Sequence, residues 1–156
     1  MFRKIKLAER KIDDTIALEI LTKGSYGVLS TIGKDGFPYG VPLNYTYMEN
    51  SICFHCGMDG HKLDNIKQNN KVSFCVVTKS KVLGNKFDTD YESIIAFGKT
   101  VEEHEAAQKE KIFMSLLNKY SPEAIAAGKN YMKKYWNDTK VLKIKIEHIT
   151  GKAYKK

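Results

Sequence analysis

Long apolar segments, paired cysteines and arginines are all scarce in this sequence. No apolar run approaches the roughly 20 residues that cross a bilayer, and the first residues are charged where a secretory signal would be apolar. Three cysteines make no disulfide framework, which fits a reducing compartment. We therefore expect a cytoplasmic protein with no membrane partner, whose 156 residues form a single domain over residues 1–156.

Arginine occurs only at Arg3 and Arg10, although the formal net charge is +8. The other 24 basic residues are lysines, spread from Lys4 to Lys156 rather than gathered in one run. Arginine reads guanine and phosphate through paired hydrogen bonds, whereas lysine is a point charge common on any solvated surface. The composition therefore argues against a nucleic acid as the main partner and favours a small anionic ligand.

Strands outnumber helices in the periodicity of the sequence. Helical spacing predicts helices over residues 13–24, 61–69, 105–120 and 122–136. Period-two alternation predicts strands over residues 26–32, 39–47, 51–56, 71–78, 91–101 and 140–152, with a loop at 79–90. Because most of these strands are joined by short turns, we expect an antiparallel sheet closed into a barrel, with helices packed outside it.

Two turn-forming residues restrict the first strands. Asp35 and Gly36 supply the positive φ that a tight hairpin needs after the strand 26–32. Pro42 lies inside the next strand and cannot donate to a strand ladder. That strand is therefore an edge, a bulge, or a place where the backbone faces a ligand.

The residues from Gly57 to Lys62 form the most informative stretch of the chain. A strand ends, glycines allow a tight turn, and a helix begins with His61 and Lys62 in its first turn. Free amide groups and the positive end of the helix dipole favour a phosphate there, and Lys62 adds a full charge. The alternative is a polar loop with a solvated lysine. The spacing of a Walker loop is absent.

Cys53 and Cys56, with His55 between them, could indicate a metal site or a redox dithiol. Residues three apart on a strand point to opposite faces, so the two thiols converge only if the strand ends between them. The third cysteine, Cys75, is isolated, and no second Cys/His pair completes a zinc site. We expect structural cysteines and no metal.

Several short motifs follow one another in a specific order. They are Tyr26-Gly27-Val28-Leu29-Ser30-Thr31, Val41-Pro42-Leu43-Asn44, Phe54-His55 followed by Gly60-His61-Lys62-Leu63-Asp64-Asn65-Ile66, and Ser93-Ile94-Ile95-Ala96-Phe97-Gly98. Over residues 10–152 this order resembles the flavin-binding split β-barrel superfamily. Within it, the chain is most similar to the pyridoxamine 5′-phosphate oxidase-related proteins grouped with the nitroimidazole-resistance reductases.

The resemblance implies a mainly β fold, a six-stranded antiparallel split β-barrel with peripheral helices. It also implies a homodimer that binds FMN at the subunit interface. On this resemblance, the cofactor-binding residues are expected in four places along the chain. These are the backbone of Val41, Pro42, Leu43 and Asn44 along the flavin ring, His55 and Cys56 beside the ring, His61 and Lys62 at the phosphate, and Ser93 reaching the flavin of the other subunit.

The sequence departs from the resemblance at His61, where oxidases of the family usually carry arginine. The C-terminal half also contains no arginine, which argues against oxidation of a phosphorylated pyridoxamine. We therefore expect an FMN-dependent oxidoreductase that transfers electrons to a small organic acceptor, with His55 as a proton donor or orienting group. The alternatives are a flavin-binding or redox-sensing protein without turnover, and a related barrel that binds haem or a deazaflavin.

Overall fold

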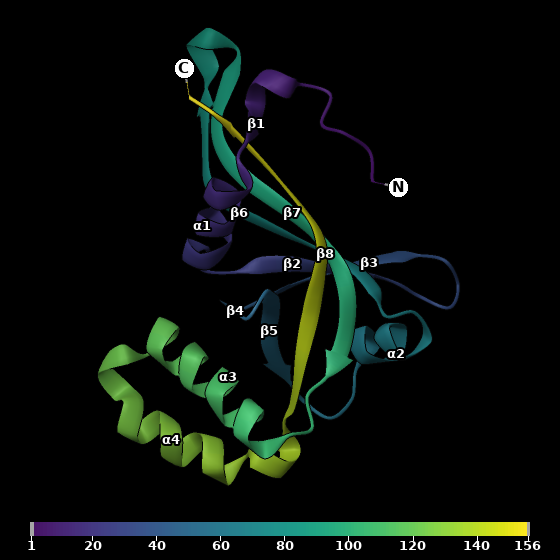
Figure 1. Cartoon of the computed structure of the whole chain (residues 1–156), viewed down its shortest axis with the longest axis vertical. Helices are drawn as coiled ribbons and strands as arrows, with labels where there is room; N and C mark the ends of the chain where they lie inside the picture. Colours follow the sequence, from purple (N-terminus) through teal and green to yellow (C-terminus); the bar gives the residue numbers. More distant parts are fainter. Residues whose placement is uncertain (1, 156) are drawn as a thin grey trace.

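The computed structural model describes residues 2–155, and their strands form one antiparallel sheet (Figure 1). The hydrogen-bonded order is β3-β2-β6-β7-β8-β5-β4, and β1 pairs with β8. Six strands have six or more residues: β2 (Gly27–Ile32), β3 (Pro38–Leu43), β5 (Ser51–Cys56), β6 (Lys71–Leu83), β7 (Asp88–Glu102) and β8 (Lys140–Tyr154). Two short ones are added: β1 (Lys11–Ile12) and β4 (Thr46–Met48). The predicted split-barrel class is confirmed, with a slightly larger strand count.

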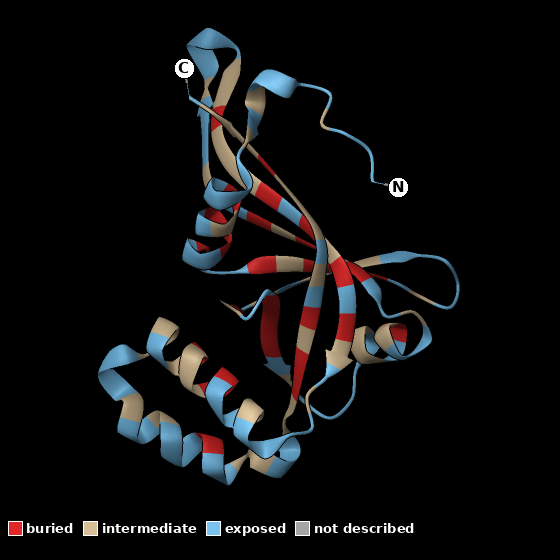
Figure 2. Ribbon diagram, viewed as in Figure 1, coloured by how far each residue is buried: buried red, intermediate tan, exposed pale blue. Residues whose placement is uncertain are grey.

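The sheet curls around one apolar core without closing on itself. Its two edge strands, β3 and β4, are consecutive in the chain and are separated only by Asn44 and Tyr45. The edges therefore meet at one corner, where the expected single strand 39–47 is broken in two. Tyr45, Phe54 and Phe74 are fully buried inside the curl, and Figure 2 shows the buried positions gathered on the strands.

Four α-helices lie around the sheet. They are α1 (Asp14–Lys23), α2 (His61–Gln68), α3 (Ala106–Tyr120) and α4 (Ile125–Lys134). The pair α3 and α4 covers β4 and β5 through a second apolar cluster that includes Cys53, Phe113 and Met132. Within residues 2–155, no helix combines the length and the apolar character needed to cross a membrane.

The predicted loop at residues 79–90 is wrong. β6 and β7 stay paired out to Leu83 opposite Asp88, and only the 3-10 turn η2 (Gly84–Lys86) separates them. This outer hairpin projects beyond the body of the molecule (Figure 1). Because most of its side chains face solvent, its sequence lacks the apolar alternation that marks a half-buried strand.

The interpretation of Pro42 and of the Asp35-Gly36 turn is confirmed. β3 is an edge strand, so a residue without an amide hydrogen is tolerated there. Gly36 has a φ of +82°, and the turn is closed by the amide of Gly33 donating to the carbonyl of Phe37 at 2.9 Å.

Candidate functional site

The glycine-containing loop between β5 and α2 adopts the geometry that its sequence predicts. β5 ends at Cys56 and α2 begins at His61. Gly60 has a φ of +128°, and a Cβ atom at Gly57 or Gly60 would meet nothing within 4 Å. The carbonyl of Gly60 already accepts the amides of residues 63 and 64. The amides of His61 and Lys62 are the ones that a helix start leaves without an intrahelical acceptor, and they border open space.

The charges around Cys56 identify Lys62 as the available cation of this corner. Burial raises the pKa of the Cys56 thiol, while the nearby ammonium groups of Lys62 and Lys140 act in the opposite direction. Lys140 is bound to both carboxylate oxygens of Glu102, at 2.8 and 3.1 Å. Lys62 is half-buried and makes no ion pair with any described residue. Its charge is therefore free to meet an anion.

The imidazole of His61 packs against the edge strand β3. Its ring centroid lies 4.1 Å from that of Tyr39, with 34° between the planes. The start of α2 is thereby held against β3. This contact ties the residues expected at the phosphate to the strand that carries Val41, Pro42 and Leu43.

β3 has a free backbone edge. Its other edge pairs with β2, from Gly27 opposite Leu43 to Ile32 opposite Pro38. The side chains of Val41 and Leu43 are half-buried against the core, and that of Pro42 is exposed. This leaves peptide groups of the strand, rather than side chains, to contact a ligand.

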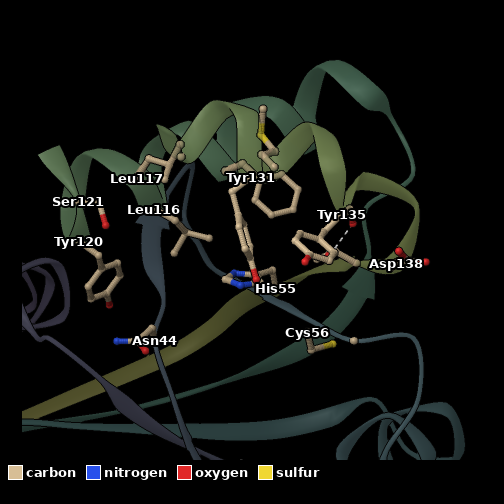
Figure 3. Close-up of a pocket in the computed structure, with 15 residues that line it drawn as sticks. Asn44, His55, Cys56, Leu116, Leu117, Tyr120, Ser121, Tyr131, Tyr135 and Asp138 are labelled. Carbon is tan, nitrogen blue, oxygen red and sulfur yellow. Dashed lines mark hydrogen bonds between the residues drawn. The ribbon is translucent and has the colours of Figure 1, made fainter. Parts of the chain in front are cut away.

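A cavity of about 540 Å³ lies between β5 and the helix pair α3/α4 (Figure 3). Its volume is within the range of small-molecule sites. Asn44, His55 and Cys56 belong to its sheet side. The helical side is mostly apolar and aromatic: Phe113, Leu116, Leu117, Tyr120, Ser121, Gly128, Tyr131, Met132, Tyr135, Asp138 and Thr139, with Gly57 completing the rim.

His55 points into this cavity. In Figure 3 its side chain and that of Tyr131 are directed toward one another from opposite walls. The ring of Phe113 lies 5.7 Å from the imidazole. His55 keeps solvent access, but partial desolvation by the cavity walls lowers its pKa below the ordinary value, which favours the neutral imidazole. A neutral imidazole offers one donor and one acceptor to a bound molecule.

Tyr120 holds the corner where the two edges of the sheet meet. Its hydroxyl accepts the amide of Tyr45 at 3.0 Å and lies 2.8 Å from the carbonyls of both Ser25 and Tyr45. The side-chain amide of Asn44 also donates to the carbonyl of Ser25, at 3.1 Å. These contacts join α3 to the strand end that carries Asn44.

Sequence reasoning missed the helical wall of the cavity. Tyr120 and Phe113 give no local signal, because their contacts with Tyr45 and His55 are remote in sequence. Tyr131 and Tyr135, with ring centroids 4.5 Å apart, also belong to this wall, and Tyr131 is 67% exposed. Trp136 packs on the second apolar cluster.

Ser93 is not brought to this site within one chain. It pairs with Lys152 on β8, whereas His55 pairs with Val141. The two positions on β8 are 11 residues apart, roughly 35 Å of extended strand at ~3.3 Å per residue. The prediction that Ser93 serves the other subunit therefore stays a prediction.

The cysteines do not converge. Cys53 is buried in the cluster under α3 and α4, whereas Cys56 packs toward the main core. Burial raises the pKa of Cys53 to about 12, which makes it an inert thiol. Across residues 2–155, no three His, Cys, Asp or Glu side chains gather as metal ligands.

Comparison with known proteins gives a family and a shared fold. A sequence model described as pyridoxamine 5′-phosphate oxidase matches residues 13–153. No curated protein matches the chain. A candidate 5-nitroimidazole antibiotic resistance protein from Bacteroides thetaiotaomicron superposes with a TM-score of 0.73 at 21% identity, over 91% of this chain and 85% of the other.

Two further solved structures share the fold. A FAD-binding protein from Mesorhizobium loti has a TM-score of 0.69 at 22% identity, over 94% of this chain and 97% of the other. A FAD and heme binding protein from Mycobacterium smegmatis has a TM-score of 0.80 at 14% identity, over 94% and 74% of the two chains. At these identities, the likeness concerns the fold alone.

Proposed function

We propose, since the chain belongs to the pyridoxamine 5′-phosphate oxidase family, that it binds FMN and transfers electrons to a small organic acceptor. The observation that carries the proposal is a juxtaposition. The loop from Gly57 to Lys62 offers open space and a lysine without an ion pair, which suit a phosphate. The free edge of β3 suits a flat ring, and the aromatic cavity that contains His55 suits a reacting partner.

The phosphate of FMN suits the corner between β5 and α2. The amides of His61 and Lys62 point away from the helix start, and the Lys62 ammonium supplies a charge-assisted hydrogen bond. The open space around Gly57 and Gly60 admits the phosphate oxygens close to the backbone. One lysine matches a monophosphate, which favours FMN over a dinucleotide.

The ring would lie between the free edge of β3 and the end of β5. Peptide groups from Val41 to Asn44 would bind its polar edge, and His55 and Cys56 would border it. When bound, FMN supplies the transfer of electrons. His55, whose neutral form is favoured because partial desolvation lowers its pKa, would orient the acceptor and hold or donate a proton through one ring nitrogen.

The lining of the cavity favours an uncharged acceptor. Asp138 is the only Asp or Glu among the lining residues, and no Lys or Arg is found among them, although the chain carries 24 lysines. A second phosphate, such as that of a phosphorylated pyridoxamine, would find no cation there. The tyrosine and phenylalanine rings suit a flat aromatic molecule.

A second copy of the chain would complete the site. Ser93 lies on the outer face of β7 beside two exposed apolar residues, Val77 and Ile95. Water-exposed β-branched side chains on a sheet face are better covered by a partner. We place the homodimer contact on this face. Replacing Ile95 with Lys should weaken both the dimer, measured by sedimentation velocity, and the affinity for FMN.

Titration of the apoprotein with FMN tests the proposal. Lys62→Ala should weaken binding about 10- to 100-fold, the loss of one charge-assisted hydrogen bond (roughly 1.5–3 kcal/mol). Lys67→Ala, an exposed lysine at the other end of α2, is the matched control and should leave the affinity unchanged. Equal FMN affinity in Lys62→Ala and the parent chain would refute the phosphate assignment.

Turnover separates an enzyme from a flavin-binding or redox-sensing protein. The holoprotein should oxidise NADH or NADPH in the presence of nitroaromatic or quinone acceptors. Flavin reduction without multiple turnovers would favour the sensing role. The visible spectrum gives an independent control, because a haem Soret band in place of flavin bands would assign the cavity to haem.

A further inference from the structure

Three segments that are distant in sequence lie side by side at one end of the molecule. They are the outer β6–β7 hairpin (residues 79–92), the N-terminal stretch 8–12 and the end of β8 (152–155), which together we name the basic arm. Lys11 pairs with Lys152, and Tyr91 pairs with Tyr154. Figure 1 shows the hairpin, η1 (Ala8–Arg10) and the C-terminus together at the top of the view.

The basic arm is richer in cations than the chain as a whole. Its 23 residues contain seven Lys and Arg against four Asp and Glu, a net charge of +3. Arg10 belongs to it. The spread of lysines along the sequence therefore conceals a concentration of charge that the strand pairing creates.

The acids of the hairpin are engaged within the chain, whereas its outer lysines are not. Asp90 is buried and lies 4.0 Å from the Lys79 ammonium, and Glu92 accepts the hydroxyl of Thr78 at 3.2 Å. Lys81 and Lys86, next to the turn, are exposed and form no ion pair with a described residue. Their charges face solvent.

The tip of the hairpin combines these lysines with bare apolar side chains. Phe87 is 98% exposed and Val82 76% exposed. Phe87 also has a φ of +50°, a left-handed conformation that a bulky residue adopts at a cost and that Gly or Asn would adopt more easily. Neither packing nor backbone conformation within the described residues calls for phenylalanine here.

We propose that the basic arm docks on an anionic lipid surface. Phe87 and Val82 would enter the headgroup region while the surrounding cations bind lipid phosphates and carboxylates. Such a contact needs no membrane-spanning segment. The sequence-based expectation of no membrane partner rested on the lack of a spanning segment, so it does not rule out docking at the membrane surface. The inference is independent of the proposed flavin chemistry.

Lipid fits the tip better than the other polyanions do. An aliphatic side chain such as Val82 gains from a headgroup–acyl boundary but offers no stacking face to a base. Arg10, which could read phosphate bidentately, lies with its guanidinium carbon 4.1 Å above the ring of Tyr154. A second copy of the arm would bring its own net +3 against this one and repel it.

Vesicle co-sedimentation of the full chain tests the proposal. Binding to vesicles of phosphatidylcholine with 30% phosphatidylserine should exceed binding to pure phosphatidylcholine at least tenfold and should fall as salt rises. Phe87→Asn, which suits the backbone conformation, should reduce binding about fivefold without lowering the melting temperature. The double variant Lys81→Glu/Lys86→Glu should reduce it more than tenfold.

Lys129→Glu/Lys133→Glu is the matched control, with the same change of charge on exposed positions of α4. It should bind vesicles within twofold of the parent chain. Equal loss in the control would overturn the proposal, because the effect would then be one of net charge. It would also be overturned by equal binding to both vesicle types, by tighter binding to single-stranded RNA than to vesicles, or by a Phe87→Asn variant that only dissociates a dimer.

Discussion

The ammonium of Lys119 on α3 is buried without a hydrogen-bond acceptor among residues 2–155. It lies 4.0 Å from the ring centroid of Tyr45. Desolvation lowers the pKa of Lys119 from 10.5 to about 8. The charged amine therefore opposes folding, and the attraction to the aromatic ring offsets only part of that cost. We predict that Lys119→Met stabilises the protein at pH 7.

The expected size follows from linkage between proton binding and folding. The lowered pKa corresponds to at most about 3 kcal/mol at neutral pH. Because the side chain is only half-buried and solvent screens the remainder, we expect a gain of about 1–2 kcal/mol. Between pH 8 and 10.5 Lys119 is protonated in the unfolded chain but largely deprotonated in the folded chain. The free energy of unfolding of the parent chain therefore rises with pH over this range. The stability advantage of Lys119→Met should disappear over the same range.

Urea unfolding of the parent chain and of Lys119→Met, at pH 7 and pH 10, measures both effects. Lys111→Met, an exposed lysine on the same helix, controls for helix propensity and for the general loss of positive charge. A destabilised Lys119→Met variant at pH 7, or a stability difference that does not shrink toward pH 10, would refute the desolvation argument.

Three other changes test the geometry of the corner and of the sheet. Tyr120→Phe leaves the amide of Tyr45 without its acceptor and should cost about 1–3 kcal/mol of unfolding free energy in urea. Gly98→Ala would place a Cβ atom 2.2 Å from the carbonyl oxygen of Lys145, so the melting temperature should fall by an amount equivalent to about 2–3 kcal/mol. NMR titration of His55 should give a pKa below that of a solvated histidine, and the shift should diminish in Phe113→Ala if burial is its cause.

The geometry of the loop from Gly57 to Lys62 could be predicted from sequence because its determinants are local. Glycines, a helix start and a lysine lie within six consecutive residues, and the end of β5 and the start of α2 fall at the predicted residues. The aromatic wall was not predicted, since Tyr120 acts on Tyr45 across 75 positions of sequence. A tyrosine on a helix gives no sign of which distant carbonyl it will bind.

The outer hairpin shows the same limit for secondary structure. Residues 79–90 have no apolar alternation, because a strand that is solvated on both faces needs none. Their pairing is a continuation of the register set deeper in the sheet, where Phe74 faces Ala96 in the core. The sequence therefore indicated the strand origins but not their extent.

Periodicity and turn chemistry thus indicated an antiparallel sheet with outer helices, the order of most elements and the loop from Gly57 to Lys62, because each depends on neighbours a few residues apart, whereas the split-barrel class came from the family resemblance. Tertiary structure alone decided that α3 and α4 would enclose a cavity around His55. It alone also gathered lysines from three separated segments into one arm. Both outcomes depend on strand pairing and helix packing between residues remote in sequence, and no local pattern encodes which partners will meet.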